Sequence, residues 1–252
     1  MQSLDKVQSI QESRYDFPYH YIPRFDDKGI FTQVKNLDWG YEYLSYLGFV
    51  LGIINNLNYN SLLDVGCGDG RFLFELYKKT EGKKLIGIDY SAQAVKLAGL
   101  MNPHVEYICA DINDKSLFPE KFDIITLIDV LEHINPEGRN KFLESIAYYL
   151  TGNGYFIITV PSNNLKVSPK HYQHFDKQQL VQILYPYFKI KEIWYLNQHS
   201  YKNKITKKIL SNKLFILNNK KLLRLIYEYY TNNLLVSNEK RCSRLALTCE
   251  KI

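Results

Sequence analysis

The sequence predicts an α/β protein with a doubly wound, mostly parallel, seven-stranded sheet and helices on both faces. Short apolar segments rich in β-branched residues alternate with amphipathic segments, as in successive strand–helix units. The connections between these segments are short, which is typical of a parallel sheet covered by helices. A glycine-rich loop also joins the first of the core strands to the helix that follows it.

The elements follow from local patterns. Asp38 is expected to cap a helix from Trp39 to Asn55, after an aromatic segment in which two prolines favour extended structure. Apolar, β-branched runs predict strands at 61–66, 84–89, 105–111, 122–129, 154–161, 189–196 and 243–251. Amphipathic periodicity predicts helices at 71–80, 92–101, 138–150, 177–187 and 213–233.

The composition favours a single domain. The chain has 252 residues, and 46% hydrophobic with 23% charged residues excludes intrinsic disorder, collagen and a disulfide scaffold. Four scattered cysteines without a CxxC pair argue against a thiolate zinc site. No apolar run approaches the ~20 residues of a membrane-spanning helix, so we predict a cytoplasmic protein without a transmembrane segment. The expected parts are an N-terminal lid (1–44), a core (45–196), a basic helical insert (197–241) and a last strand (242–252).

The glycine loop carries the strongest functional signal. Asp64-Val65-Gly66-Cys67-Gly68-Asp69-Gly70 directly follows a predicted strand and opens a helix. Its glycines allow a tight turn and close approach of backbone N–H groups to a ligand. Asp89 ends the next strand, where a carboxylate meets ribose hydroxyls in a doubly wound fold. The G-x-G-x-G spacing and the acidic loop disfavour a pyrophosphate and favour a ligand with ammonium and sulfonium groups.

These motifs resemble those of class I S-adenosylmethionine-dependent methyltransferases. LLDVGCGDGRF (62–72) resembles their first motif, and IGIDYS (86–91), CADI (109–112), IITLIDVLEHI (124–134) and GNGYFIITVPS (152–162) resemble the later ones in order. The resemblance implies S-adenosylmethionine as cofactor. It implies that Gly66, Cys67, Gly68 and Gly70 contact the methionine end of the cofactor, and that Asp64 contacts the ammonium group through water. Asp89 would bind the ribose, and Tyr90, Asp111 and Ile112 the adenine. Ile128 and Val130 would surround the methyl group.

Acidic and imidazole side chains follow the fourth and fifth core strands. A helical start after the fourth strand would place Asp129, Glu132 and His133 on one face, as the candidate catalytic residues. Together with His171 they resemble the Glu-x-x-Glu-His…His metal site of small-RNA 3′-terminal ribose methyltransferases, and similar residues occur in ubiquinone-pathway O-methyltransferases that use a divalent cation. This resemblance implies Mg, Mn or Zn bound by Glu132, His133 and His171, with His174 as the fallback. A catalytic base or acceptor-binding role for His133, and a purely structural one, stay open.

Two further segments are candidate acceptor-binding elements. Tyr19, His20 and Tyr21 lie in a stretch that folds over the cofactor in this superfamily, although a packed N-terminal arm explains them equally well. In the basic insert, Lys220, Lys221 and Arg224 accompany an apolar stripe of Leu222, Leu225, Ile226 and Tyr229. The insert is interpreted as a solvated face over a core-facing stripe, an anion-binding surface for the acceptor, or a dimer surface. Membrane attachment is least favoured, because the stripe is expected to be needed for the core.

The motifs together predict transfer of a methyl group to an oxygen of a small polar, anionic metabolite. Phosphorylated, phosphoramidate or sugar-linked acceptors are considered, because FPYHYIP (17–23) and HYQHF (171–175) resemble capsule-biosynthesis methyltransferases. The alternatives are a metal-dependent RNA ribose 2′-O-methyltransferase and a non-catalytic cofactor-binding scaffold. A DNA partner is not expected, because no Asp/Asn-Pro-Pro-Tyr motif follows the fourth core strand.

Overall fold

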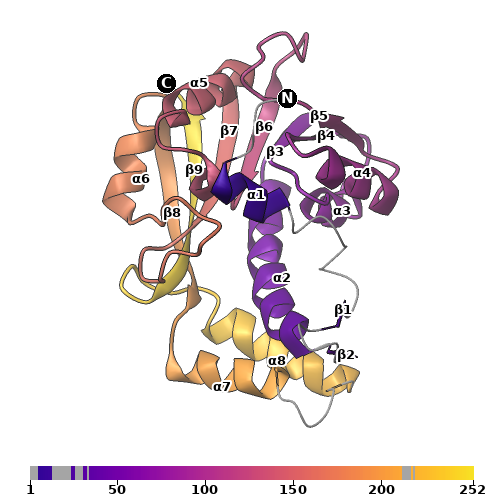
Figure 1. Cartoon of the computed structure of the whole chain (residues 1–252), viewed down its shortest axis with the longest axis vertical. Helices are drawn as coiled ribbons and strands as arrows, with labels where there is room; N and C mark the ends of the chain where they lie inside the picture. Colours follow the sequence, from indigo (N-terminus) through magenta and orange to yellow (C-terminus); the bar gives the residue numbers. More distant parts are fainter. Residues whose placement is uncertain (1–4, 13–23, 26–30, 33, 212–216, 218) are drawn as a thin grey trace.

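The computed structural model describes residues 5–12, 24–25, 31–32, 34–211, 217 and 219–252 and shows a central sheet between two layers of helices (Figure 1). The strands are β1 (Arg24–Phe25), β2 (Phe31–Thr32), β3 (Ser61–Val65), β4 (Lys84–Asp89), β5 (Glu106–Cys109), β6 (Phe122–Ile128), β7 (Leu150–Pro161), β8 (Phe188–Gln198) and β9 (Cys242–Lys251). The helices are α1 (Lys6–Glu12), α2 (Val34–Asn55), α3 (Arg71–Tyr77), α4 (Ala92–Met101), the 3₁₀ turn η2 (Leu131–His133), α5 (Arg139–Tyr149), α6 (Lys177–Leu184), α7 (Tyr201–Leu210) and α8 (Lys220–Asn233).

The main sheet has seven strands in the order β5-β4-β3-β6-β7-β9-β8. Neighbouring strands pair in parallel from β5 to β7, whereas β9 runs antiparallel between β7 and β8. The predicted seven-stranded, mostly parallel sheet is therefore confirmed. The chain order reverses between β3 and β6, and a doubly wound sheet binds its ligand at the carboxyl ends of the strands at such a point.

Two apolar layers hold the helices against the sheet. On one face, Phe142 and Ile146 of α5 and Leu180 of α6 join the buried core. On the other face, α2 and α3 contribute residues such as Val50 and Leu73. Side chains that alternate along each strand supply both layers, which explains why the predicted strands are continuous apolar runs.

Several elements differ from the prediction. The helix α2 begins at Val34, so Asp38 lies inside it and is not its cap; no glycine or proline separates Val34 from Trp39 to stop the helix there. The strand β7 begins at Leu150, because the predicted Gly-Asn-Gly turn is absorbed as an irregularity of its pairing with β6.

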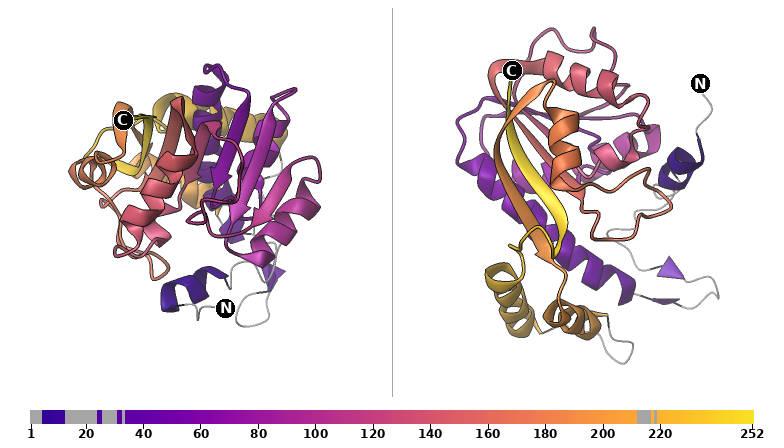
Figure 2. Two further views of the ribbon diagram at one scale, coloured as in Figure 1. Left: turned by 90° about the horizontal axis from the view of Figure 1, so that it is seen from above. Right: turned by 90° about the vertical axis from the view of Figure 1, so that its left-hand side faces the viewer.

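The basic insert forms two helices where the sequence predicts one. α7 is not anticipated by the periodicity, although Ser200 caps it by accepting from the backbone N–H of Asn203. α8 begins at Lys220, capped by Asn219. Figures 1 and 2 show both helices beside the N-terminal half of α2, at the end of the molecule beyond β8.

Polar contacts attach this insert to α2. The Tyr41 hydroxyl donates to the backbone carbonyl of Ile226 at 2.6 Å. Lys207 of α7 forms an ion pair with Glu42 at 2.8 Å. Within the described residues, no helix has the length and apolar character needed to cross a membrane.

Candidate active site

A cavity of about 920 Å³ opens at the carboxyl ends of the central strands, where the strand order reverses. Ten of the eleven residues expected to bind the cofactor line it: Asp64, Gly66, Cys67, Gly68, Asp89, Tyr90, Asp111, Ile112, Ile128 and Val130. Val7, Gln8 and Gln11 of α1 also line it, so this N-terminal helix contributes to the cavity wall. The volume is large enough for a nucleoside-sized cofactor together with a small second ligand.

The glycine loop needs residues without a side chain at two positions. Gly66 has a φ of +73°, and a Cβ there would lie 2.4 Å from Cγ2 of Val130. Gly70 has a φ of +77°, and its Cβ would lie 2.7 Å from the hydroxyl of Tyr107. Gly70 does not line the cavity. Its missing side chain leaves room for Tyr107, so the loop packs against β5 at the start of α3.

Asp64 lies at the bottom of the cavity, on β3. Its side chain is buried and accepts a 2.6 Å hydrogen bond from Thr126, the residue opposite Asp64 on the neighbouring strand β6. Burial raises the pKa of Asp64 to about 7. The hydrogen bond from Thr126 lowers this pKa in part, and the negative charge of nearby Asp89 raises it further. A cationic ligand beside Asp64 would stabilise the carboxylate form.

Asp89 supports the glycine loop from the end of β4. One carboxylate oxygen accepts from the backbone N–H of Gly68 at 2.9 Å, and the other accepts from the N–H of Ser91 at 2.9 Å. The adjacent Tyr90 is about half exposed, at 47%, and Asp111 and Ile112 complete the wall after β5. These residues form the acidic half of the cavity.

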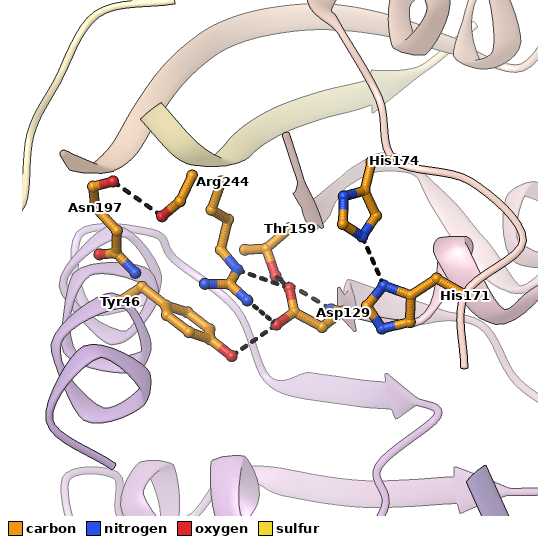
Figure 3. Close-up of polar contacts among 8 residues, drawn as sticks. Tyr46, Asp129, Thr159, His171, His174, Asn197 and Arg244 are labelled. Carbon is orange, nitrogen blue, oxygen red and sulfur yellow. Dashed lines mark hydrogen bonds and ion pairs between the residues drawn. The ribbon is translucent and has the colours of Figure 1, made fainter. Parts of the chain in front are cut away.

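Asp129 occupies the opposite half and is held by three side chains (Figure 3). Arg244 binds both carboxylate oxygens, with Nε 2.8 Å from Oδ1, while Tyr46 donates to Oδ2 at 2.7 Å and Thr159 to Oδ1 at 2.9 Å. Burial opposes ionisation, but the Arg244 guanidinium and the hydrogen bonds keep the pKa of Asp129 below its ordinary value. The Arg244 guanidinium also lies 3.7 Å from the centre of the Tyr46 ring.

This arrangement corrects the expectation that Asp129 shares a face with Glu132 and His133. Asp129 has a φ of +55°, an unusual conformation for a residue with a side chain, and only Leu131–His133 form a helical turn. The left-handed backbone turns Asp129 toward β9, and its carboxylate is engaged by Arg244.

Sequence analysis missed Tyr46, Thr159 and Arg244. Tyr46 and Arg244 lie 83 and 115 positions from Asp129 along the chain, so no local motif connects them. One signal was available, because Arg244 is a charge directly before the apolar run Leu245–Leu247 of the last strand.

Glu132, His133 and His171 converge in the same half of the cavity. One ligand atom from each residue lies within 4.8 Å of the others. Glu132 is 2% exposed, and its carboxyl Oε2 has no hydrogen-bond partner. Burial, together with the negative charge of Asp129, raises the pKa of Glu132 well above its ordinary value.

Hydrogen bonds fix the orientation of the imidazoles. Nδ1 of His133 lies 2.8 Å from the Lys170 carbonyl, which only accepts, so His133 donates from Nδ1 and keeps a lone pair on Nε2. His174 likewise donates from Nδ1 to the Leu165 carbonyl at 3.1 Å, so its Nε2 accepts from Nδ1 of His171 at 2.8 Å. Nε2 of His171 therefore also keeps its lone pair.

All three histidines are neutral at physiological pH. Burial, reinforced by Lys170, lowers the pKa of His133 to about 4. Burial and the neighbouring His133 lower the pKa of His171 to about 3, and burial also lowers the pKa of His174. His174 does not line the cavity; it orients His171.

Comparison with known proteins gives the family. Residues 62–154 match a family described as a methyltransferase domain. The matched segment contains the glycine loop, Asp89, Asp111 and the residues that follow β6. Residues 62–154 therefore form a methyltransferase domain, and the comparisons support the class I S-adenosylmethionine-dependent methyltransferase superfamily.

The relatives of this methyltransferase share its core but differ in their acceptors. It is 35% identical over 115 residues to the protein-lysine N-methyltransferase EFM4 of Saccharomyces cerevisiae, covering 39% of this chain and 50% of that protein. It is 33% identical over 109 residues to the ubiquinone biosynthesis O-methyltransferase of Nitrobacter winogradskyi, covering 42% and 40%. These matches span half or less of the relatives' length, so they do not transfer an acceptor.

A solved structure supports the fold of the described residues. The N-methyltransferase NodS of Bradyrhizobium japonicum, in complex with S-adenosylhomocysteine, aligns with a TM-score of 0.60 at 14% identity, covering 98% of this chain and 99% of NodS. Identity this low supports the fold and not the substrate.

Of the remaining predicted acceptor residues, those on α8 do not line the cavity. Tyr19, His20 and Tyr21 lie outside the described residues, so their expected role stays a prediction. Lys220, Lys221 and Arg224 are exposed on α8 and do not line the cavity, and Arg224 pairs with Glu228 of its own helix. An acceptor bound in the cavity would therefore meet other basic residues.

Proposed function

We propose that this chain transfers the methyl group of S-adenosylmethionine to an oxygen of a small anionic metabolite. The observation that carries the proposal is the division of the cavity into two electrostatic halves. Asp64, Asp89 and Asp111 line the half beside the glycine loop and suit a cationic cofactor. Lys170 and Arg244 line the half beyond the ends of β6 and β7, where Arg244 pairs with Asp129 and the pKa of the buried Glu132 is raised. These two basic side chains are the groups that would meet an anionic acceptor.

The chemistry asks mainly for alignment and exclusion of water. The acceptor oxygen attacks the methyl carbon in line with the carbon–sulfur bond, which breaks as its electron pair returns to sulfur. A phosphate or phosphoramidate oxygen needs no base. If the acceptor is a hydroxyl and no cation is bound, its proton passes to Nε2 of His133, the ring nitrogen that is not engaged by the Lys170 carbonyl. A role in surface-glycan biosynthesis would fit sugar-linked acceptors of this kind.

This assignment is tested by supplying methyl-labelled S-adenosylmethionine together with panels of phosphorylated sugars, nucleotide sugars and short RNAs. We expect label on an oxygen of one anionic small molecule. Transfer to RNA, to nitrogen only, or to none of these acceptors while the cofactor binds would contradict it.

We further propose that Glu132, His133 and His171 hold a divalent cation of the Mg, Mn or Zn type. The residues fit such an ion, because a buried carboxylate oxygen without a partner and two imidazole lone pairs meet at one place. When bound, the cation would lower the pKa of an acceptor hydroxyl. His174 then acts by orienting His171.

The metal proposal makes a direct prediction. After loading with Mn²⁺ or Zn²⁺ and desalting, the unaltered chain should retain one ion, measured by elemental analysis. The His171→Ala variant should bind the ion about 100-fold more weakly, because one of three ligands is lost. His104→Ala, which removes a histidine outside the cavity, is the matched control. Equal metal content in all three proteins, or no retained metal and no effect of a chelator on activity, would overturn the site.

Cofactor affinity should depend on pH through Asp64. Its pKa is about 7 in the folded chain against an ordinary 3.8, so the ligand-free protein keeps this proton at pH 6 and has mostly lost it at pH 7.5. The cationic cofactor binds the carboxylate form, so its affinity should rise about eightfold between these two values. The range stays below the pKa of the cofactor's own amino group, about 7.7–8.0 for an α-amine.

Calorimetry in buffers of different ionisation enthalpy measures this effect. At pH 6, binding should release about one proton. The Asp64→Asn variant should bind weakly at both values and show no such release. Affinity that does not change with pH in the unaltered chain would exclude this role for Asp64.

A further inference from the structure

Of the four residues in the apolar stripe predicted on the basic insert, three are exposed, and Ile226 is partly buried. Leu222, Leu225 and Tyr229 of α8 are 43%, 61% and 40% exposed, and within this helix only Tyr230 is fully buried. On α7, Tyr201 is 78% and Ile205 is 42% exposed. The positions of the exposed residues repeat every three or four positions, so each helix presents an apolar stripe away from the protein.

Basic side chains flank both stripes. The two helices carry seven Lys and Arg residues against a single Glu. By helical spacing, Lys204 and Lys208 border one side of the α7 stripe and Lys202 the other, while Lys221 borders the α8 stripe. Among the described residues, only Lys207 and Arg224 of these seven form ion pairs.

We propose that α7 and α8 form a docking surface for a membrane rich in anionic phospholipid. Apolar side chains enter the boundary between headgroups and acyl chains, and the flanking lysines contact the lipid phosphates. This reverses the expectation from sequence, because most of the stripe that seemed to be needed for the core is free of it. The proposal does not depend on which acceptor the cavity takes.

The charges favour an anionic membrane over other occupants. A second copy docking symmetrically would place the same surface against itself, so two strongly basic faces would oppose each other. The phosphates of a nucleic acid would pair with the lysines, but they would give the exposed Leu and Ile side chains no apolar surface to contact. A membrane surface offers both negative charge and an apolar layer.

Co-sedimentation with vesicles tests the proposal. The full chain should bind vesicles of phosphatidylcholine containing about one third phosphatidylglycerol far better than phosphatidylcholine alone, and high salt should weaken binding. The Leu225→Asp variant should bind about tenfold more weakly. The double variant Lys204→Gln/Lys208→Gln should lose about fivefold for each charge removed.

Matched variants elsewhere on the surface separate this result from a general effect of charge. Leu100→Asp replaces a leucine of α4 that is 72% exposed, and Lys79→Gln/Lys189→Gln removes two exposed lysines from other elements. Both should bind vesicles like the unaltered chain. Equal losses in the control variants, no preference for anionic vesicles, or a solution dimer dissolved by Leu225→Asp without vesicle binding would overturn the proposal. Capture of RNA with no vesicle binding would overturn it as well.

Discussion

Replacing Asp89 with alanine should abolish measurable binding of S-adenosylmethionine while the chain stays folded. In the proposed site, the variant would lose two charge-assisted hydrogen bonds to the ribose, each worth about 1.5–3 kcal/mol, so affinity should fall about 100-fold or more. It also loses the carboxylate that accepts from the backbone N–H groups of Gly68 and Ser91, which holds the loop in shape. Calorimetric titration measures the affinity, and circular dichroism with thermal unfolding measures the fold.

Two further variants make this result specific. Asp89→Asn keeps the size of the side chain and one acceptor oxygen, and it should bind more tightly than Asp89→Ala but well below the unaltered chain. Asp114→Ala removes an exposed carboxylate that follows β5 and does not line the cavity, so its affinity should be unchanged. Tight binding by a folded Asp89→Ala variant would remove the basis for the cofactor site.

The second large effect is expected at Arg244. In Arg244→Met, the Asp129 carboxylate keeps its bonds from Tyr46 and Thr159 but loses its counter-ion in a site where 21% of its side chain is exposed. Removing one partner of such a pair should lower the free energy of unfolding by about 3 kcal/mol at neutral pH. Denaturant titration measures this loss, and it should shrink as the pH falls and Asp129 takes up a proton.

A double variant separates the unpaired charge from lost packing. Asp129→Asn in the Arg244→Met background removes the unpaired charge and should restore most of the stability, but not the affinity for an anionic acceptor. Arg224→Met breaks an exposed pair on α8 and should leave stability unchanged. A loss in Arg244→Met that Asp129→Asn does not relieve would show that the ion pair is not what stabilises this site.

The cofactor half of the site was predictable because its signals are local. The glycines at 66, 68 and 70 and the carboxylates Asp64 and Asp89 belong to two consecutive strand–loop units. Steric needs at Gly66 and Gly70 explain why the motif takes glycine there. The sheet was predictable for the same reason, since each buried parallel strand is a continuous apolar run.

The acceptor half could not be predicted to the same degree, because its parts meet only in the folded chain. Tyr46 comes from α2 and Arg244 from the antiparallel strand β9, and the order of these elements in the sheet is not encoded in either segment. The positive φ of Asp129 also depends on its tertiary contacts. The proximity of Glu132, His133 and His171 was anticipated by a family resemblance and not by spacing alone.

The basic insert shows a third limit. Periodicity correctly predicts that Leu222, Leu225 and Tyr229 share one face of a helix. Periodicity does not predict whether that face packs on the protein core or faces outward, because the helix is equally amphipathic in either orientation. Here the packing of Tyr230 and the contact between Tyr41 and Ile226 orient the helix with the stripe outward.

The central claim is that the cavity at the carboxyl ends of β3, β4 and β6 is a binding site for S-adenosylmethionine. The most direct measurement is calorimetric titration of the unaltered chain at pH 7.5 with S-adenosylmethionine and, separately, with S-adenosylhomocysteine. The cavity predicts saturable binding of one molecule per chain for both ligands. A folded chain that gives no binding heat at either of two temperatures, and no thermal stabilisation by either ligand, would contradict the claim.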